Sequence, residues 1–161
     1  MKIEDDFVFP VYISDKILQE IKKICAGHKV EVFGYLVGEI LSWKDKKYLL
    51  IEHQFYSKKS FKSNATLVAQ IEGASGEFNE SLEKLKKKTN NKGLRGVGWW
   101  HSHPNFGVFL SPTDVKTHTY FFPESVFVAL VVDPIRDEFE FFSIDNQSDK
   151  GYKVVSSAII N

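Results

Sequence analysis

The chain has 161 residues, of which 43% are hydrophobic and 26% charged, a composition that indicates a folded globular protein and excludes a disordered one. Basic and acidic residues number 21 each, so the formal net charge of zero gives no electrostatic reason to expect nucleic acid or an anionic membrane as a partner. The single cysteine, Cys25, excludes an internal disulfide and a cluster of thiolate metal ligands.

The first ten residues are acidic and contain no long apolar run, which argues against a signal peptide. No segment approaches the run of about 18 apolar residues that predicts a membrane span. No repeat, low-complexity block or linker divides the sequence. We therefore expect one cytoplasmic domain over residues 1–161.

Three segments carry apolar side chains at helical spacing. The first follows Ser14, a residue type favoured at the N-cap, and it is expected to end at Gly27. The second and third helices are predicted over residues 77–88 and 112–121.

Runs rich in β-branched and aromatic residues predict strands around these helices. Gly34 and Gly38 inside the first run indicate a bulge or a close approach of another backbone. The order of helices and strands predicts an α/β, or layered α+β, domain with a mixed sheet and about three flanking helices. In chain order the predicted strands are residues 30–40, 47–55, 65–71, 94–102, 125–132, 138–144 and 152–159.

A pair of histidines at the end of one predicted strand carries the clearest chemical signal. His101 and His103 are two residues apart, so a strand directs both imidazoles to the same face. Asp114 follows on the first turn of the third predicted helix, where its carboxylate could meet them. Two histidines and one carboxylate are the ligand set of a catalytic zinc site that leaves a fourth position for water. The sequence therefore predicts one Zn²⁺ ion per chain.

The same region also has the pattern of a helix start. Ser111 would be the N-cap, Pro112 the first helical residue and Asp114 the acidic residue of the first turn. We expect this capping role to compete with tight zinc binding by Asp114. His118, one turn further along the helix, is expected to be structural or exposed, and support of a metal ligand is an alternative role for it.

A zinc hydrolase also needs a general base that does not bind the metal. Glu31 is a candidate because it lies in an otherwise apolar predicted strand, where a lone carboxylate is costly unless it is paired or functional. An exposed position on that strand would explain it equally well, and spacing alone does not select it. Ser111 could offer its hydroxyl to the oxyanion of a tetrahedral intermediate.

Together these segments resemble a known family. The stretch from His101 to Asp114 reads H-S-H, seven residues, then S-x-x-D, which is similar to the signature of the JAMM (MPN+, Mov34/PAD-1) metalloproteases. The stretch from Glu31 to Gly38 resembles the family's E-x-x-G-x-L-x-G strand, and residues 131–134 resemble its V-x-D-P. The resemblance implies a JAB-like domain with a curved mixed sheet.

This resemblance implies a zinc isopeptidase that cleaves behind the C-terminal tail of a ubiquitin-like protein, in deconjugation or in precursor maturation. It implies that His101, His103 and Asp114 bind zinc. It further implies that Glu31 is the general acid/base and that Ser111 supports the oxyanion.

The short chain resembles compact bacterial JAB-domain peptidases, some of which share operons with E1- and E2-like conjugation enzymes. A ubiquitin-like protein or its conjugate is thus the expected partner, together with such enzymes. A peptidase that trims a sulfur-carrier protein would share the same zinc site and is an alternative. A catalytically silent scaffold is another alternative, although silent relatives usually lose one of the five site residues.

The substrate tail is expected to be extended and to add a strand at a sheet edge. The polar segment 56–64 is the expected loop for this contact, through Tyr56 and Phe61. Trp100, next to the histidine pair, is a further candidate for contact with the substrate.

Overall fold

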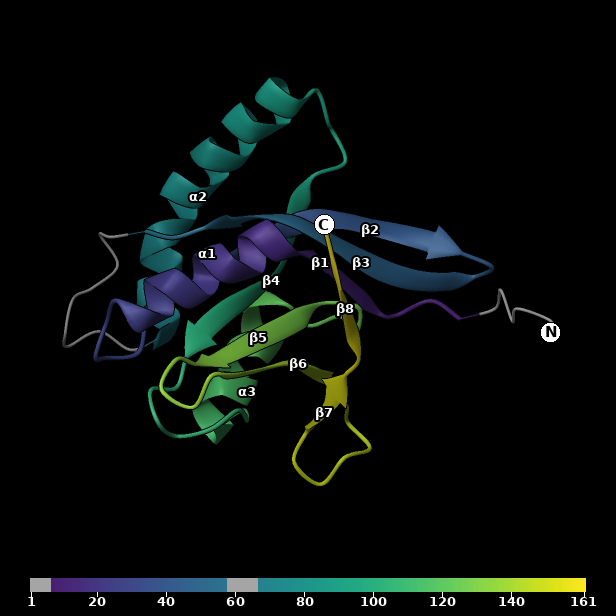
Figure 1. Cartoon of the computed structure of the whole chain (residues 1–161). Coiled ribbons are helices and arrows are strands. Elements are labelled where there is room, and N and C mark those ends of the chain that lie inside the picture. The colour runs from purple at the N-terminus through teal and green to yellow at the C-terminus, as the bar shows by residue number, and fades with distance from the viewer. Residues whose placement is uncertain (1–6, 58–66) are drawn as a thin grey trace.

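The structure of the chain is a computed structural model that describes residues 7–57 and 67–161. Its strands form one mixed sheet, and its helices pack against that sheet (Figure 1). The elements, in chain order, are β1 (Val11–Ser14), α1 (Asp15–Ala26), β2 (Phe33–Trp43), β3 (Lys46–Phe55), α2 (Leu67–Thr89), β4 (Arg95–Ser102), α3 (Pro112–Phe121), β5 (Val128–Asp133), β6 (Glu138–Ile144), β7 (Tyr152–Val155) and β8 (Ser157–Ile160).

The sheet has the strand order β7-β6-β5-β4-β2-β3-β1-β8. The β4–β5, β1–β3 and β1–β8 pairs are parallel and the remaining pairs are antiparallel, so the predicted mixed sheet is confirmed. The single strand expected over residues 152–159 is wrong, because β7 and β8 lie at opposite edges of the sheet. Only Ser156 separates these two strands, so the sheet must curve until its edges meet at this segment.

Helices cover both faces of the sheet. On β3, the Phe55 ring lies 5.7 Å from the Phe78 ring of α2, whereas the next side chain, Gln54, donates to Glu20 of α1 at 2.9 Å. Adjacent residues of a strand point to opposite faces. α1 and α2 therefore pack on opposite faces of the sheet, as their places in Figure 1 indicate.

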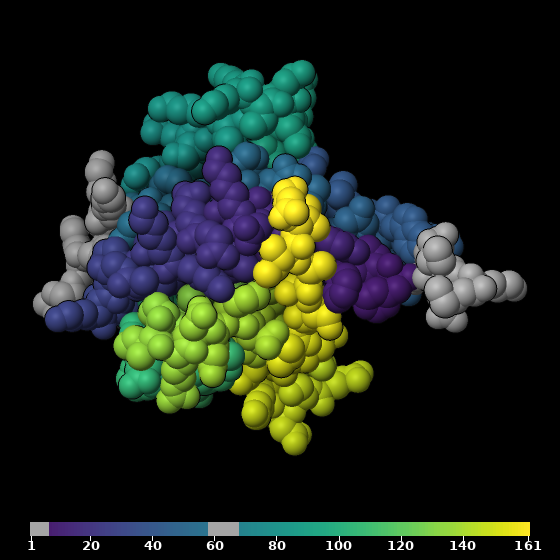
Figure 2. All heavy atoms as spheres, in the orientation of Figure 1, coloured from purple at the N-terminus to yellow at the C-terminus, as the bar shows by residue number. Residues whose placement is uncertain are grey.

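The segment 65–71 was expected to be a strand, and this prediction is wrong: the chain is helical from Leu67 onward and continues into the second predicted helix. Ile71, Ala74 and Phe78 are buried at helical spacing, and their packing on β2 holds this first part of the helix. Leu82 and Leu85 also pack against the core, and the later part of α2 projects from the body of the molecule (Figure 2). No helix in the described residues is long and apolar enough to cross a membrane.

Two glycines in β2 permit close contacts, as predicted. A Cβ on Gly34 would clash with the Trp100 ring, and one on Gly38 would clash with the backbone carbonyl of Leu50. The pairing of β2 also shifts register at Val37, next to Gly38, which confirms the predicted bulge. The contact at Gly34 holds β2 close to β4, the strand that carries the histidines, and the contact at Gly38 holds β2 close to β3.

Candidate metal centre

The end of β4 carries the histidine pair. β4 lies between β2 and β5, and its pairing continues past the strand, where Ser102 N donates to Val32 O and His103 N donates to Val132 O, both at 2.9 Å. This double support directs the His101 and His103 rings to the same side, with ring centroids 4.7 Å apart. The predicted placement of both imidazoles on one face is confirmed.

Asp114 brings a carboxylate to these rings from the first turn of α3. Its Oδ2 lies 3.2 Å from Nε2 of His101 and 3.2 Å from Nε2 of His103, and the two Nε2 atoms are 3.1 Å apart. All three residues are buried. The three residues singled out as metal ligands from the sequence therefore meet in space.

The electrostatics of this cluster favour a charged carboxylate. Burial alone would raise the pKa of the Asp114 carboxyl, but hydrogen bonds with the two imidazoles and with Ser111 N–H hold it well below its usual range. Burial also lowers the pKa of His103, but the hydrogen bond with Asp114 and the nearby carboxylates raise it above its ordinary value overall.

The triangle of ligand atoms fits a tetrahedral metal ion. Zinc bonds of about 2.0–2.1 Å place tetrahedral ligand atoms about 3.3–3.4 Å apart. The three sides measured here are 3.1, 3.2 and 3.2 Å. Without a cation or a proton between them, two imidazole nitrogens and a carboxylate oxygen would direct lone pairs at one another. The group can therefore hold a zinc ion and leave one coordination position open.

The carboxylate of Asp114 both caps α3 and lies close to the two histidines. Ser111 Oγ accepts from Asp114 N at 3.1 Å, and Asp114 Oδ2 accepts from Ser111 N at 2.9 Å, which completes a capping box. Capping does not turn this carboxylate away from the histidines, because a carboxylate oxygen has two lone pairs and Oδ2 faces both Ser111 N and the imidazoles; zinc binding by Asp114 stays a prediction. Capping in fact orients this oxygen toward the imidazoles.

Glu31 lies before β2 begins, not inside a strand, and its side chain is 63% exposed. The argument from a place in an apolar strand is therefore wrong, and the alternative of an exposed strand residue is correct for the exposure but not for the strand. Its Oε1 nevertheless lies 3.7 Å from His103 Nε2. Val32 N donates to Ser102 Oγ at 2.9 Å, which holds the backbone next to Glu31 against β4.

A pocket of about 390 Å³ opens at this cluster. The Phe109 ring lies 4.8 Å from the His103 ring, and Phe106 is 69% exposed at the rim. The pocket therefore combines polar groups at its base with apolar walls. Its lining residues are Glu31, His103, Phe106, Phe109, Ser111, Thr113 and Asp114.

The family model described as JAB1/Mov34/MPN/PAD-1 ubiquitin protease matches residues 8–123, more than half of the chain and a range that contains the whole cluster. The chain belongs to this family. Its fold and its histidine motif therefore agree with the resemblance seen in the sequence.

Several JAB-family proteins are similar to this chain over most of its length. Ubiquitin carboxyl-terminal hydrolase RPN11 of Saccharomyces cerevisiae is 35% identical over 134 residues, covering 82% of this chain and 41% of that protein. The 26S proteasome non-ATPase regulatory subunit 14 of Dictyostelium discoideum is 31% identical over 121 residues, covering 74% of this chain and 37% of that protein. The chain thus spans about two fifths of the length of these curated relatives.

The fold of this chain is also found in a solved structure of another protein. The solution structure of protein DSY2949 from Desulfitobacterium hafniense matches it with a TM-score of 0.60, covering 93% of this chain and 92% of that chain. At 17% sequence identity, the match shows that the fold is shared.

His101 has a buried support made by Trp99 and His118, of which the sequence indicated only the structural role of His118. The Trp99 ring stacks on His101 at 4.3 Å and donates from Nε1 to Nδ1 of His118 at 3.0 Å. His118 is completely buried, and burial lowers its pKa to about 4. Its place one helical turn after Asp114, on the same face of α3, was the available signal.

The three residues expected to contact substrate have different outcomes. Trp100 is completely buried, and its Nε1 donates to Gln54 at 3.2 Å, so its position supports packing and not direct contact with substrate. Tyr56 lies against the Trp100 ring at 5.9 Å, and its contact with substrate stays a prediction. Phe61 lies outside the described residues.

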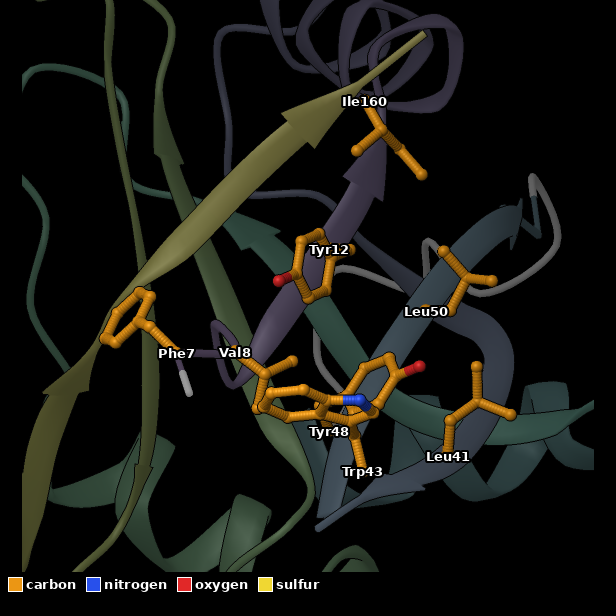
Figure 3. Close-up of a pocket in the computed structure, with 8 residues that line it drawn as sticks. All are labelled: Phe7, Val8, Tyr12, Leu41, Trp43, Tyr48, Leu50 and Ile160. Atoms are coloured by element: carbon orange, nitrogen blue, oxygen red, sulfur yellow. The ribbon is translucent and has the colours of Figure 1, made fainter. Parts of the chain in front are cut away.

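A second pocket, of about 490 Å³, is lined by apolar and aromatic residues (Figure 3). Leu41 and Trp43 line it near the far end of β2, whereas Phe33, at the other end, pairs with His101. Its described lining residues include no histidine, cysteine or carboxylate, so we assign the metal centre, not this pocket, as the candidate site. The lining residues are Phe7, Val8, Tyr12, Leu41, Trp43, Tyr48, Leu50 and Ile160.

Proposed function

We propose that this chain is a zinc-dependent isopeptidase that cleaves behind the C-terminal tail of a ubiquitin-like protein, in deconjugation or in precursor maturation. The observation that carries the proposal is that Glu31, His103, Ser111 and Asp114 line one pocket of a JAB-family fold, and that His101 completes the buried cluster with His103 and Asp114 beside it. The yeast relative is a ubiquitin carboxyl-terminal hydrolase, which supports the proposed substrate class.

In this proposal His101, His103 and Asp114 hold one zinc ion per chain. Bound zinc supplies a Lewis acid that lowers the pKa of water and polarises a carbonyl. The protein side chains perform the remaining steps.

Glu31 is the proposed general base and acid. Its carboxylate stands at the pocket near His103 but outside the triangle of ligand atoms, so it is free to exchange protons. It takes a proton from the attacking water and delivers it to the amine that leaves when the isopeptide bond breaks.

Ser111 is the proposed oxyanion donor. Its Oγ accepts the N–H of Asp114 with one lone pair, and no described residue accepts its hydroxyl hydrogen. That hydrogen can therefore be donated to the oxygen on which negative charge develops.

The intact cluster supports an enzyme over a silent scaffold. We propose that the protein acts in the cytoplasm with E1- and E2-like conjugation enzymes as partners. The segment 56–64 remains our proposed contact for the substrate tail, although most of it lies outside the described residues.

The test combines metal analysis with cleavage of ubiquitin-like fusion proteins. We expect one zinc per purified chain, loss of zinc in His103→Ala, and zinc retention in Glu31→Gln with turnover reduced roughly 10²- to 10⁴-fold. The matched control is Glu52→Gln, an exposed carboxylate on β3, which should keep wild-type turnover.

Three results would contradict parts of this proposal. Active protein without zinc would overturn the metal assignment. Zinc loss in Glu31→Gln would make Glu31 a ligand. Cleavage of a sulfur-carrier precursor, with no cleavage of any ubiquitin-like fusion, would favour the sulfur-carrier peptidase.

A further inference from the structure

A buried carboxylate at the end of β5 holds the loop between β4 and α3. Asp133 is completely buried, although its position ends a strand. It accepts four backbone N–H groups at 2.8–3.1 Å, two from this loop and two from its own turn. The four donors belong to Asn105, Gly107, Ile135 and Arg136.

The two loop donors have unusual backbone conformations. Asn105 has φ 63° and Gly107 has φ 84°, both in the left-handed region. Arg136 adds a third link, donating from Nη2 to Asn105 O at 3.2 Å. Glycine and asparagine adopt such φ values more readily than other residues, and the hydrogen bonds to Asp133 hold the loop in this shape.

Gly107 connects this network to the metal centre. Its N–H donates to Asp133 Oδ2 at 2.8 Å, and its carbonyl accepts from His103 Nδ1 at 3.2 Å. His101 differs, because its buried Nδ1 has no hydrogen-bond partner among the described residues and its ring stacks on Trp99 instead. Of the two rings, His103 is the one that the loop orients.

We propose that Asp133 is a positioning residue for His103. By fixing the carbonyl of Gly107, it keeps the proton of His103 on Nδ1 and directs the Nε2 lone pair into the triangle with Asp114. The inference rests on the proposed zinc function only for its consequence, which is tighter metal binding.

The substitution Asp133→Asn tests this role. Asp133 Oδ1 accepts three N–H groups and Oδ2 accepts that of Gly107, so an asparagine that keeps its oxygen at the first position turns its NH₂ group toward Gly107. We expect zinc affinity, measured by competition with a chelator, to weaken roughly 10- to 100-fold. In the metal-free protein, at a pH high enough for the His103 ring to be neutral, ¹⁵N NMR should show a smaller fraction of the Nδ1–H tautomer in Asp133→Asn than in wild type.

Asp137→Asn is the matched control. This carboxylate follows the same strand, but its side chain is 88% exposed and its ion pair with Lys22 is 3.8 Å long. The control should keep the wild-type zinc affinity and the wild-type tautomer of His103.

If Asp133→Asn does not fold, the substitution Gly107→Ala tests whether the carbonyl of residue 107 orients His103. Alanine disfavours φ 84°, and its Cβ would lie 3.3 Å from Arg136, so this variant should displace the carbonyl of residue 107. The other three N–H groups that Asp133 accepts are unchanged by it. Weaker zinc binding and a changed tautomer would support the proposal.

A folded Asp133→Asn with wild-type zinc affinity and tautomer would overturn the proposal, as would a Gly107→Ala that behaves like wild type. The NMR measurement needs no metal. If wild-type protein bound no zinc while Asp133→Asn still changed the tautomer, the zinc function would fail and the positioning role would stand.

Discussion

The observed capping task of Ser111 and its proposed oxyanion task are separable, because capping uses a lone pair of its Oγ and the proposed oxyanion support would use its hydrogen. Glycine is nearly as good an N-cap, costing only about a few tenths of a kcal/mol, but it has no hydroxyl. Ser111→Gly should therefore leave the melting temperature almost unchanged and reduce kcat on a ubiquitin-like fusion roughly 10²- to 10³-fold.

Ser111→Thr is the control for this prediction, since it keeps both the cap and the hydroxyl. It should retain most of the wild-type turnover. Equal turnover of Ser111→Gly and wild type would show that Ser111 acts on the helix alone.

His118 should make the stability of the metal-free protein depend on pH. Its folded pKa of about 4 lies below the ordinary histidine value of 6.5, so between these values the unfolded chain binds more protons. The contribution of neutral His118 is therefore complete above about pH 6.5 and is lost as the pH falls toward 4, by about 3 kcal/mol in total.

The variant His118→Gln removes this titration and keeps an acceptor for the Trp99 N–H. Its free energy of unfolding, measured with urea from pH 7 to pH 4.5, should fall less steeply than that of wild type. Parallel curves for the two proteins would contradict the buried, neutral state of His118.

The sequence predicted the metal-centre residues unequally, for physical reasons. His101, His103 and Asp114 could be found because strand alternation and a helix start are local rules. Glu31 could not be found by such rules, since its distance from His103 depends on the pairing of β2 with β4. Family resemblance, and not its expected burial, selected it.

The glycines of β2 and α2 should respond oppositely to alanine. In α2, a Cβ on Gly73 would meet nothing within 4 Å, so Gly73→Ala should stabilise the fold by about 0.5–1 kcal/mol through helix propensity. In β2, a Cβ on Gly38 would clash with the Leu50 carbonyl, so Gly38→Ala should destabilise it by about 1–3 kcal/mol.

Thermal and urea unfolding of both variants measure this contrast. A stabilised Gly38→Ala would show that β2 and β3 can separate enough to admit a methyl group. A destabilised Gly73→Ala would show that this part of α2 does not lie against open space.

The two glycines of α2 explain why only half of this helix was predicted. Gly73 and Gly76 lie between the expected strand and the expected helix, where glycine normally weakens a helix. Burial of Ile71 and Phe78 on β2 outweighs that local preference, and Tyr35 donates its hydroxyl hydrogen to Ile71 O at 2.8 Å. Packing partners so distant in sequence leave no mark on the local pattern.

Closure of the sheet shows the same limit at longer range. Its core strands were predicted, because buried strands are apolar throughout or alternate clearly. β1 has only four residues, and β7 and β8 read as one segment, so their pairing with opposite edges could not be seen locally. This closure leaves β4, which carries the histidines, near the middle of the sheet.

Zinc should also stabilise the whole fold, because its proposed ligands join the end of β4 to the start of α3. A ligand that binds only the folded state contributes about 2.7 kcal/mol at a hundredfold excess over its Kd. For a chain of this size, each kcal/mol corresponds to about 2–4 °C. A strong chelator should therefore lower the Tm of wild type by about 5–10 °C.

His103→Ala should show no chelator-dependent shift, since the site has lost a ligand. Glu31→Gln should show the full shift, because its proposed role is proton transfer and not metal binding. Calorimetry of the three proteins with and without chelator thus separates binding from chemistry without any substrate. A wild-type Tm that is independent of chelator, in protein shown to contain zinc, would mean that the metal does not join β4 to α3.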